Sequence, residues 1–179
     1  MMVNSMKKLL VVVDYQNDFV TGSLGFENAK ELDELIAKRI QEYKDNGDQV
    51  IYTFDTHYED YLDTVEGKHL PVKHCLKDSD GHKLYGKVAS TLENGDVTFE
   101  KKTFPSLELA KYLENKEYQS VELCGLVSNI CVLSNVIMVR SALPNVEIYV
   151  DKNLTMSFDE NMNEYFLKIL EGLHINVIG

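Results

Sequence analysis

The stretch VELCGLVSNICV, residues 121–132, decides the fold of this chain. Its first half is an apolar run that ends at a glycine, which is typical of a strand followed by a tight turn. Its second half predicts the first turn of a helix that carries Cys131. Unpaired backbone N–H groups at a helix N-terminus favour thiolate over thiol, so Cys131 is a candidate nucleophile. A buried packing cysteine is the alternative, because free cysteines usually fill cores.

Short runs rich in Val and Ile recur on both sides of this stretch and alternate with amphipathic segments. Such nearly continuous apolar runs suit strands that are covered on both faces, as in a parallel sheet. The alternation predicts one α/β domain over residues 1–179, a three-layer α/β/α sandwich around a doubly wound, six-stranded, mainly parallel sheet. The expected strands are 8–13, 49–54, 96–100, 120–125, 146–150 and 175–178.

Amphipathic segments predict the helices between these strands. The clearest covers residues 28–46, where Asn28 and Glu31 match a capping box and Gly47 follows the last turn. Further helices are expected at 106–115, 129–143 and 159–172. The apolar face of the first helix is expected to consist of Leu32, Leu35, Ile36 and Ile40.

The composition disfavours two classes of partner. The chain has 18 Lys and Arg against 29 Asp and Glu, a net charge of −11 that disfavours nucleic acid and anionic membranes. Three irregularly spaced cysteines form no disulfide framework, and the apolar run near residue 9 is too short for a signal peptide or a membrane span. We therefore expect a cytoplasmic protein. The first strand lacks the glycines of a dinucleotide-binding loop.

Chemically active side chains follow four of the predicted strands. Asp14, Asp55 and Lys101 come at the ends of the first three strands, and Cys131 follows the fourth. Ligands of doubly wound sheets bind at these carboxyl ends, so the four groups are expected to meet. Each of them alone could be a turn cap or a solvated side chain. Strand alternation allows only one of Lys101 and Lys102 to face the site, where a buried ammonium would favour the thiolate.

The segment 56–92 interrupts the alternation and contains four of the five histidines. A long segment of this kind inside a compact domain is usually functional or disordered. Asp55 and His57 share one side at strand spacing and, with Glu66 and His74, offer the oxygen and imidazole ligands that zinc, iron and manganese accept. Competing ligands are Asp63, His69 and His82, while His174, Cys75 and Cys124 are interpreted as structural.

Five motifs occur in order along essentially the whole chain. They are D-x-Q-N-D-F at 14–19, D-T-H at 55–57, P-x-x-H-C at 71–75, K-x-x-F at 101–104 and G-L-V-S-N-I-C-V-L at 125–133. Together they resemble the isochorismatase-like cysteine hydrolase superfamily and, within it, the nicotinamidase/pyrazinamidase branch. The chain departs from that pattern in having no tryptophan and in carrying Asn129 where an acidic residue is frequent.

The resemblance implies a role for each motif. It implies a catalytic triad of Asp14, Lys101 and Cys131. The implied oxyanion hole consists of the backbone N–H groups of Val127 and Cys131, beside a cis Leu126–Val127 peptide bond. It also implies a divalent metal, zinc with iron or manganese as alternatives. The implied metal ligands are Asp55, His57 and His74, with Glu66 as a possible fourth ligand. Phe19 is implied to line the substrate pocket.

The activity implied by the resemblance is that of a cysteine-dependent amidohydrolase, a nicotinamidase that converts nicotinamide and water to nicotinate and ammonia through a thioester. One alternative is another small-amide hydrolase of the superfamily, acting on carbamoyl or ureido compounds. A second alternative is a non-catalytic binding or redox module on the same fold. The implied partners are a small-molecule amide substrate and further copies of the chain in a homo-oligomer.

Overall fold

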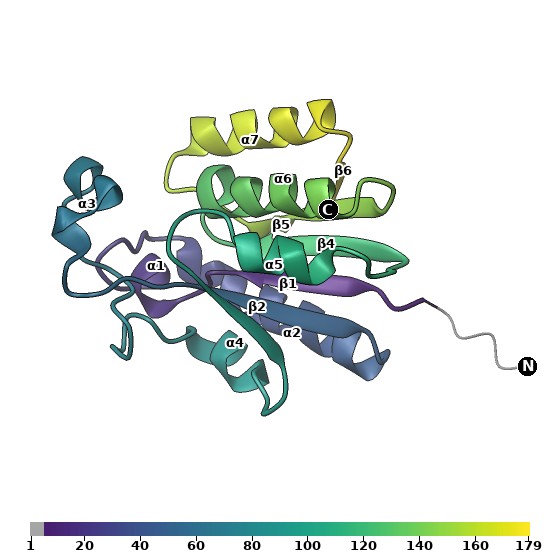
Figure 1. Ribbon diagram of the computed structural model, residues 1–179, viewed down its shortest axis with the longest axis horizontal. Coiled ribbons are helices and arrows are strands. Elements are labelled where there is room, and N and C mark those ends of the chain that lie inside the picture. Colours follow the sequence, from purple (N-terminus) through teal and green to yellow (C-terminus); the bar gives the residue numbers. More distant parts are fainter. Residues whose placement is uncertain (1–5) are drawn as a thin grey trace, which may run out of the picture.

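The computed structural model describes residues 6–179 and is built around one six-stranded sheet (Figure 1). The strand order is β3-β2-β1-β4-β5-β6, and every neighbouring pair within these residues is parallel. This confirms the predicted doubly wound α/β fold, with a sheet that is wholly rather than mainly parallel. The strands are β1 (Leu9–Val13), β2 (Gln49–Asp55), β3 (Val97–Lys101), β4 (Ser120–Gly125), β5 (Glu147–Thr155) and β6 (Asn176–Ile178).

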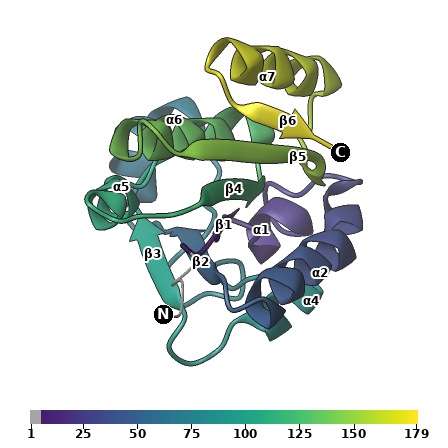
Figure 2. The same cartoon turned by 90° about the vertical axis from the view of Figure 1, so that its right-hand side faces the viewer.

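Helices cover both faces of the sheet, as the view along it shows (Figure 2). Helices α5 and α6 lie on one face, and α1, α2 and α4 lie on the other, while α7 runs beside β6. None of the helices in residues 6–179 combines the length and the apolar character needed to cross a membrane. The helices are α1 (Asn17–Val20), α2 (Leu32–Asp45), α3 (Val65–His69), α4 (Gly86–Thr91), α5 (Leu107–Leu113), α6 (Leu133–Ala142) and α7 (Glu160–Gly172).

Strand β1 separates two apolar cores, because all five of its residues are buried and alternate between its faces. Leu9 and Val11 belong to the core shared with α5, α6 and α7, whereas Leu10 and Val12 belong to the core shared with α1, α2 and α4. A strand buried on both sides needs apolar residues at every position, which explains the continuous LLVVV run. The central strand therefore holds the three layers together.

The first long helix begins later than expected. Asn28 makes no side-chain cap, and a 3-10 turn over Ala29–Glu31 precedes α2, so the predicted capping box is wrong. Leu35, which was expected on the buried face, is 47% exposed, whereas Tyr43 is buried with Ile36 and Ile40. Contacts with the sheet and with α4 thus decide which face of α2 is buried. The periodicity of α2 alone carries no information about these contacts.

Several shorter elements also differ from the sequence-based expectation. The segment 56–92 was expected to be irregular but contains a 3-10 turn at Tyr61–Asp63 and the helices α3 and α4. The four-residue helix α1 was not expected, and β5 continues to Thr155 rather than ending at residue 150. The predicted absence of a leader falls partly on residues 1–5, which lie outside the described residues. These short helices carry little periodic signal of their own.

The turn after β4 brings the tips of β1 and β4 together. Gly125 pairs with Val13, and the Leu126 N–H donates to the Val13 carbonyl oxygen at 2.9 Å. Gly125 has φ +111°, and a Cβ at this position would collide with the same carbonyl oxygen. Only glycine combines this backbone conformation with so close an approach. The glycine is therefore a requirement of the turn that leads to Cys131.

We expect Gly125→Ala to lower the free energy of unfolding by about 1–3 kcal/mol from backbone strain alone, with the collision adding to this loss. Gly172→Ala is the matched control, because a Cβ there meets no atom within 4 Å. Urea unfolding monitored by circular dichroism measures both variants. Equal stability of the two variants would contradict this account of the turn.

Candidate active site

Four side chains predicted from strand ends meet at the carboxyl edge of the sheet. Asp14 directly follows β1 with φ +46°, a left-handed conformation that aspartate tolerates better than most residues. Asp55 and Lys101 end β2 and β3 and lie opposite each other in the sheet register. Cys131 lies in the π-helical turn Ser128–Val132 between β4 and α6. Asp14 and Cys131 thus flank the point where the strand order reverses.

A buried ammonium group joins these side chains. Lys101 Nζ lies 2.5 Å from Asp14 Oδ2, 3.3 Å from Asp55 Oδ1 and 3.6 Å from Cys131 Sγ. It also donates to the Thr103 carbonyl oxygen at 3.1 Å. Lys101 is 3% exposed, whereas the side chain of Lys102 is exposed. Only one of the two lysines thus enters the site, as strand alternation predicted, and it is the one that the resemblance implied. One ammonium group is therefore in contact with both carboxylates and with the thiol.

Burial and neighbouring charges together set the pKa values of these side chains. Burial alone would lower the pKa of Lys101, but the charges of Asp14, Cys131 and Asp55 raise it well above its ordinary value. Burial raises the pKa of Asp14, and Lys101 opposes this rise only in part. Burial also raises the pKa of the Cys131 thiol well above its ordinary value, although Lys101 acts in the opposite direction. Lys101 thus favours the thiolate, as expected, but burial and the nearby carboxylates outweigh this effect.

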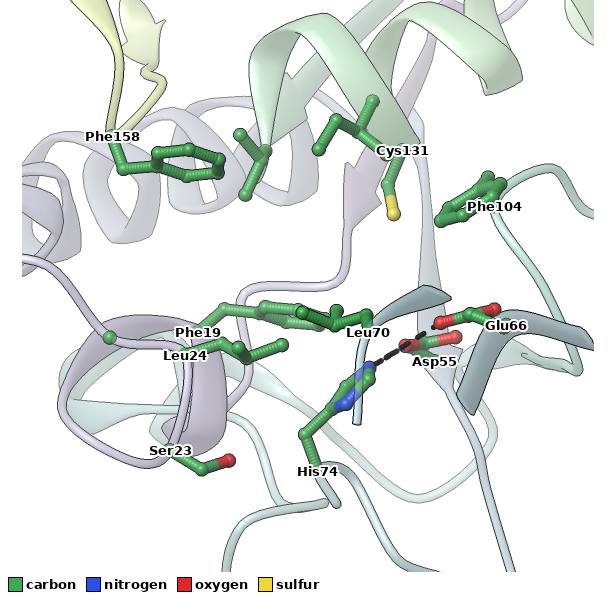
Figure 3. A pocket seen from close by; sticks show the side chains of 13 residues that line it. Phe19, Ser23, Leu24, Asp55, Glu66, Leu70, His74, Phe104, Cys131 and Phe158 are labelled. Carbon is green, nitrogen blue, oxygen red and sulfur yellow. Dashed lines mark ion pairs between the residues drawn. The ribbon is translucent and has the colours of Figure 1, made fainter. Parts of the chain in front are cut away.

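Cys131 faces a cavity of about 550 Å³ (Figure 3). In this view the sulfur points into the cavity, with Phe104 beside it and Asp55, Glu66 and His74 on the opposite wall. Val127, whose peptide bond with Leu126 is cis as the resemblance implied, lines the same cavity. The remaining wall is mostly apolar, and its residues are Phe19, Ser23, Leu24, Gly25, Leu70, Ile130 and Phe158.

A group suited to a metal ion forms one end of this cavity. One ligand atom from each of Asp55, His57, Glu66 and His74 lies within 4.8 Å of the others. His57 Nε2 is 3.0 Å from Asp55 Oδ2 and 3.5 Å from Glu66 Oε1, and His74 Nε2 is 3.3 and 3.7 Å from the same atoms. Two imidazoles and two carboxylates are a ligand set that zinc, iron and manganese accept.

The surroundings of these four residues fit a bound cation. His74 Nδ1 lies 2.8 Å from the Val72 carbonyl oxygen, and a carbonyl can only accept, so Nδ1 carries a hydrogen. In the neutral ring, Nε2 then has a free lone pair directed at the group, the arrangement that backbone carbonyls give to metal-binding histidines. Glu66 Oε2 is buried and has no hydrogen-bond partner within residues 6–179. A cation would satisfy both atoms.

The proton affinities in this group reflect its crowded charges. Burial opposes ionisation of Asp55, but Lys101, His57 and His74 together lower the pKa of Asp55 below its ordinary value. Burial raises the pKa of Glu66, and the neighbouring Asp55 raises it further. Burial tends to lower the pKa of His74, but its hydrogen bond with Asp55 raises that pKa overall. Protons bound at Glu66 and His74 thus offset part of the negative charge of this group, the charge that a bound metal ion would neutralise.

The competing ligands lie elsewhere. Asp63 and His69 are exposed on the surface, outside the four-residue group. His82 is buried, but its Nε2 pairs with Thr56 Oγ1 at 2.8 Å, and burial lowers the pKa of His82. Cys75 and Cys124 are buried free thiols that do not line the cavity.

Some residues that shape the site were not predicted. Gln16 is buried and binds the Asp55 backbone in both directions, with Oε1 accepting at 2.8 Å and Nε2 donating at 3.0 Å. Thr53 Oγ1 donates to Asp14 Oδ1 at 2.7 Å. Gln16 belongs to the first motif and could have been singled out there. Phe158 lies in the loop between β5 and α7, where no sequence signal marks it as a cavity residue.

A doubly wound sheet that brings a thiol, a carboxylate and an ammonium group to its switch point, beside a group suited to metal, offers an arrangement for nucleophilic catalysis. The chain belongs to the isochorismatase family, because residues 8–178 match the Isochorismatase domain. This agrees with the superfamily resemblance found from the five motifs.

Known relatives place the chain near the nicotinamidases. It is 29% identical over 173 residues to an uncharacterized isochorismatase family protein PncA of Bacillus subtilis (strain 168), covering 90% of this chain and 93% of that protein. The crystal structure of nicotinamidase/pyrazinamidase PncA from Bacillus subtilis superposes with a TM-score of 0.86 at 25% identity, covering 97% of this chain and 100% of that one.

Two further solved structures share the fold. Pyrazinamidase of Pyrococcus horikoshii, in complex with zinc, has a TM-score of 0.83 at 21% identity and covers 96% of this chain and 98% of its own. N-carbamoylsarcosine amidase from Thermoplasma acidophilum has a TM-score of 0.78 at 26% identity and covers 97% and 96%. Family and relatives indicate that the chain is an amide-hydrolysing enzyme, so the non-catalytic alternative is set aside.

We expect the protein to bind one divalent transition-metal ion, and His74→Ala to abolish tight binding because it removes one of four ligands. Inductively coupled plasma mass spectrometry after dialysis against zinc, iron or manganese measures the bound ion. His69→Ala is the matched control, since that histidine is exposed on α3 outside the ligand group. Unchanged metal content in His74→Ala would contradict the assignment.

Proposed function

We propose that the chain is a nicotinamidase that hydrolyses nicotinamide to nicotinate and ammonia with Cys131 as nucleophile. The observation that carries this proposal is the contact of Lys101 with both Asp14 and Cys131, together with the place of Cys131 on the wall of a cavity that a metal-type ligand group also lines. The structural likeness to a nicotinamidase at 25% identity supports the choice of substrate.

In the first half of the reaction, Cys131 Sγ attacks the carboxamide carbon while Asp14 accepts the thiol proton. The raised pKa of Asp14 makes its carboxylate a stronger base, and the ammonium of Lys101 keeps that carboxylate ionised until the attack. The backbone N–H groups of Val127 and Cys131 stabilise the tetrahedral oxyanion, and one such donor contributes about 2.7–4 kcal/mol in a known hydrolase. Asp14 then protonates the departing ammonia, leaving a thioester on Cys131.

In the second half, Asp14 takes a proton from a water molecule that attacks the thioester carbon. The C–S bond breaks, Asp14 returns this proton to the departing thiolate, and the nicotinic acid that leaves loses its own proton to solvent as nicotinate. Lys101 keeps the same contacts throughout, because its ammonium compensates whichever of Asp14 and Cys131 carries the negative charge. One carboxylate thus serves twice as base and twice as acid, which suits a group whose pKa is raised by burial.

The opposite wall of the cavity positions the pyridine ring in this proposal. Asp55, His57, His74 and Glu66 would hold the divalent ion, for which zinc is the first choice, and the ion supplies a Lewis acid that orients a ring nitrogen. Phe19 lines the cavity and packs edge-on against His74 with 5.6 Å between ring centroids. An aromatic residue beside the ligand group offers a flat apolar surface for the ring.

A carbamoyl or ureido hydrolase is the second candidate, supported by the likeness to N-carbamoylsarcosine amidase at 26% identity. Such substrates lack a pyridine ring and would use the same thiol chemistry. A cytoplasmic location and a homo-oligomeric assembly stay predictions from the sequence.

We expect Cys131→Ala to reduce ammonia release from nicotinamide to background while the far-ultraviolet circular dichroism spectrum is unchanged, because the variant lacks the nucleophile. Cys124→Ala is the matched control, since this buried thiol lies in β4 outside the cavity. Ammonia is measured with a coupled glutamate dehydrogenase assay. Appreciable turnover by Cys131→Ala would refute the covalent route.

We expect nicotinamide and pyrazinamide to release ammonia faster than N-carbamoylsarcosine or other ureido compounds, and chelator treatment to slow the pyridine and pyrazine amides. The reason is that ring nitrogens can contact a bound metal, whereas ureido compounds have none in a ring. The same ammonia assay with and without chelator compares them. Preference for a ureido compound would replace the first candidate by the second.

A further inference from the structure

We propose that Asn135 is a positioning residue for the hydrolysis, because it holds segment 102–106 against the helix that follows Cys131. This segment begins directly after Lys101 and carries Phe104 on the cavity wall. The inference rests on the proposed function for its kinetic readout.

Asn135 uses its whole amide to join the two parts. Its side chain is fully buried on α6, one turn after the nucleophile. Nδ2 donates to the Cys131 carbonyl oxygen at 2.8 Å and to the Phe104 carbonyl oxygen at 3.1 Å. Oδ1 accepts from the Ser106 N–H at 2.9 Å. Two of the three hydrogen bonds therefore reach segment 102–106, and the third binds the backbone carbonyl of Cys131.

The segment has few other attachments. Within the described residues, no backbone-to-backbone hydrogen bond involves residues 103–105, and the side chains of Lys102, Thr103 and Phe104 are exposed. The Thr103 carbonyl accepts from Lys101 Nζ, and the Phe104 carbonyl accepts from Asn135. At its far end Ser106 is buried and caps α5, where its Oγ accepts from the Leu109 N–H at 3.1 Å. Between Lys101 and Ser106, these two polar contacts supplement the little apolar burial of the segment.

The consequence for chemistry follows from what the segment touches. The Thr103 carbonyl is one acceptor of the ammonium that contacts Asp14 and Cys131. If the segment shifts, Lys101 loses an acceptor and its orientation toward the other two groups is no longer fixed. Misplacement of a reacting group by about 1 Å can cost about a hundredfold in rate. Phe104 would move with the segment and alter the cavity wall.

The test compares Asn135→Leu, which removes all three bonds at similar volume, with Val139→Ala, which removes packing from the same helix one turn further on. We expect Asn135→Leu to lower kcat/KM for nicotinamide by at least about tenfold, mainly through kcat, at a temperature where both variants are folded. We expect Val139→Ala to stay within about twofold of the unmodified protein, whatever its loss in Tm. Equal kinetic effects of the two variants would overturn the proposal.

A second variant covers the case in which Asn135→Leu does not fold. Asn135→Asp keeps the acceptor for the Ser106 N–H and loses the two donated bonds, so we again expect at least about a tenfold loss in kcat/KM. Ser134→Ala is its matched control, because Ser134 Oγ bonds only to the Ile130 carbonyl, one turn back in the same helix. Full activity of Asn135→Asp would overturn the proposal.

Hydrogen exchange separates this inference from the proposed function. Mass spectrometry should show faster exchange in a peptide covering residues 102–110 in Asn135→Leu than in Val139→Ala, because this peptide contains the hydrogen-bonded amides of Ser106, Leu109 and Ala110. If the unmodified protein releases no ammonia from nicotinamide, the proposed function fails, but this measurement still decides whether Asn135 holds the segment. Unchanged exchange in Asn135→Leu and Asn135→Asp would overturn the clamp itself.

Discussion

The ammonium of Lys101 is the interaction on which the rest of the site depends. A buried charge is costly unless it is paired, and the penalty after relaxation is still several kcal/mol for each ion. Lys101 meets this requirement through Asp14 and Asp55, which approach it from the ends of two other strands. The same ammonium reaches the sulfur of Cys131. Removing it would leave two buried carboxylates facing each other and a thiol without a cationic neighbour.

The fold supplies this arrangement because parallel strands end at the same edge. Asp14, Asp55 and Lys101 follow or end β1, β2 and β3, and the order β3-β2-β1-β4 places the turn after β4 next to Asp14. Gly125 permits the close approach of that turn to Val13. Asp14 and Cys131 can therefore both reach Lys101 without long loops.

Sequence patterns predicted this framework because β1 and β2 are short apolar runs with an aspartate at their carboxyl ends. The same reasoning failed for α2, where the buried face depends on contacts with α4 and the sheet rather than on the periodicity of α2 alone. It also missed Asn135, which lies among the apolar residues of α6 and makes contacts with a segment about thirty positions earlier. Long-range hydrogen bonds of this kind depend on the relative placement of two elements, and a local pattern contains no such information.

Asp55 connects the two halves of the cavity through a single carboxylate. Its Oδ1 contacts Lys101, its Oδ2 contacts His57 and His74, and Gln16 holds its backbone on both sides. The charge on this carboxylate is therefore shared between the ammonium and the ligand group, and a change at either end must alter the other. This sharing gives a reason for the burial of Gln16, which does not line the cavity but fixes the backbone of Asp55. A small rotation of Asp55 would disturb Lys101 and the metal ligands at once.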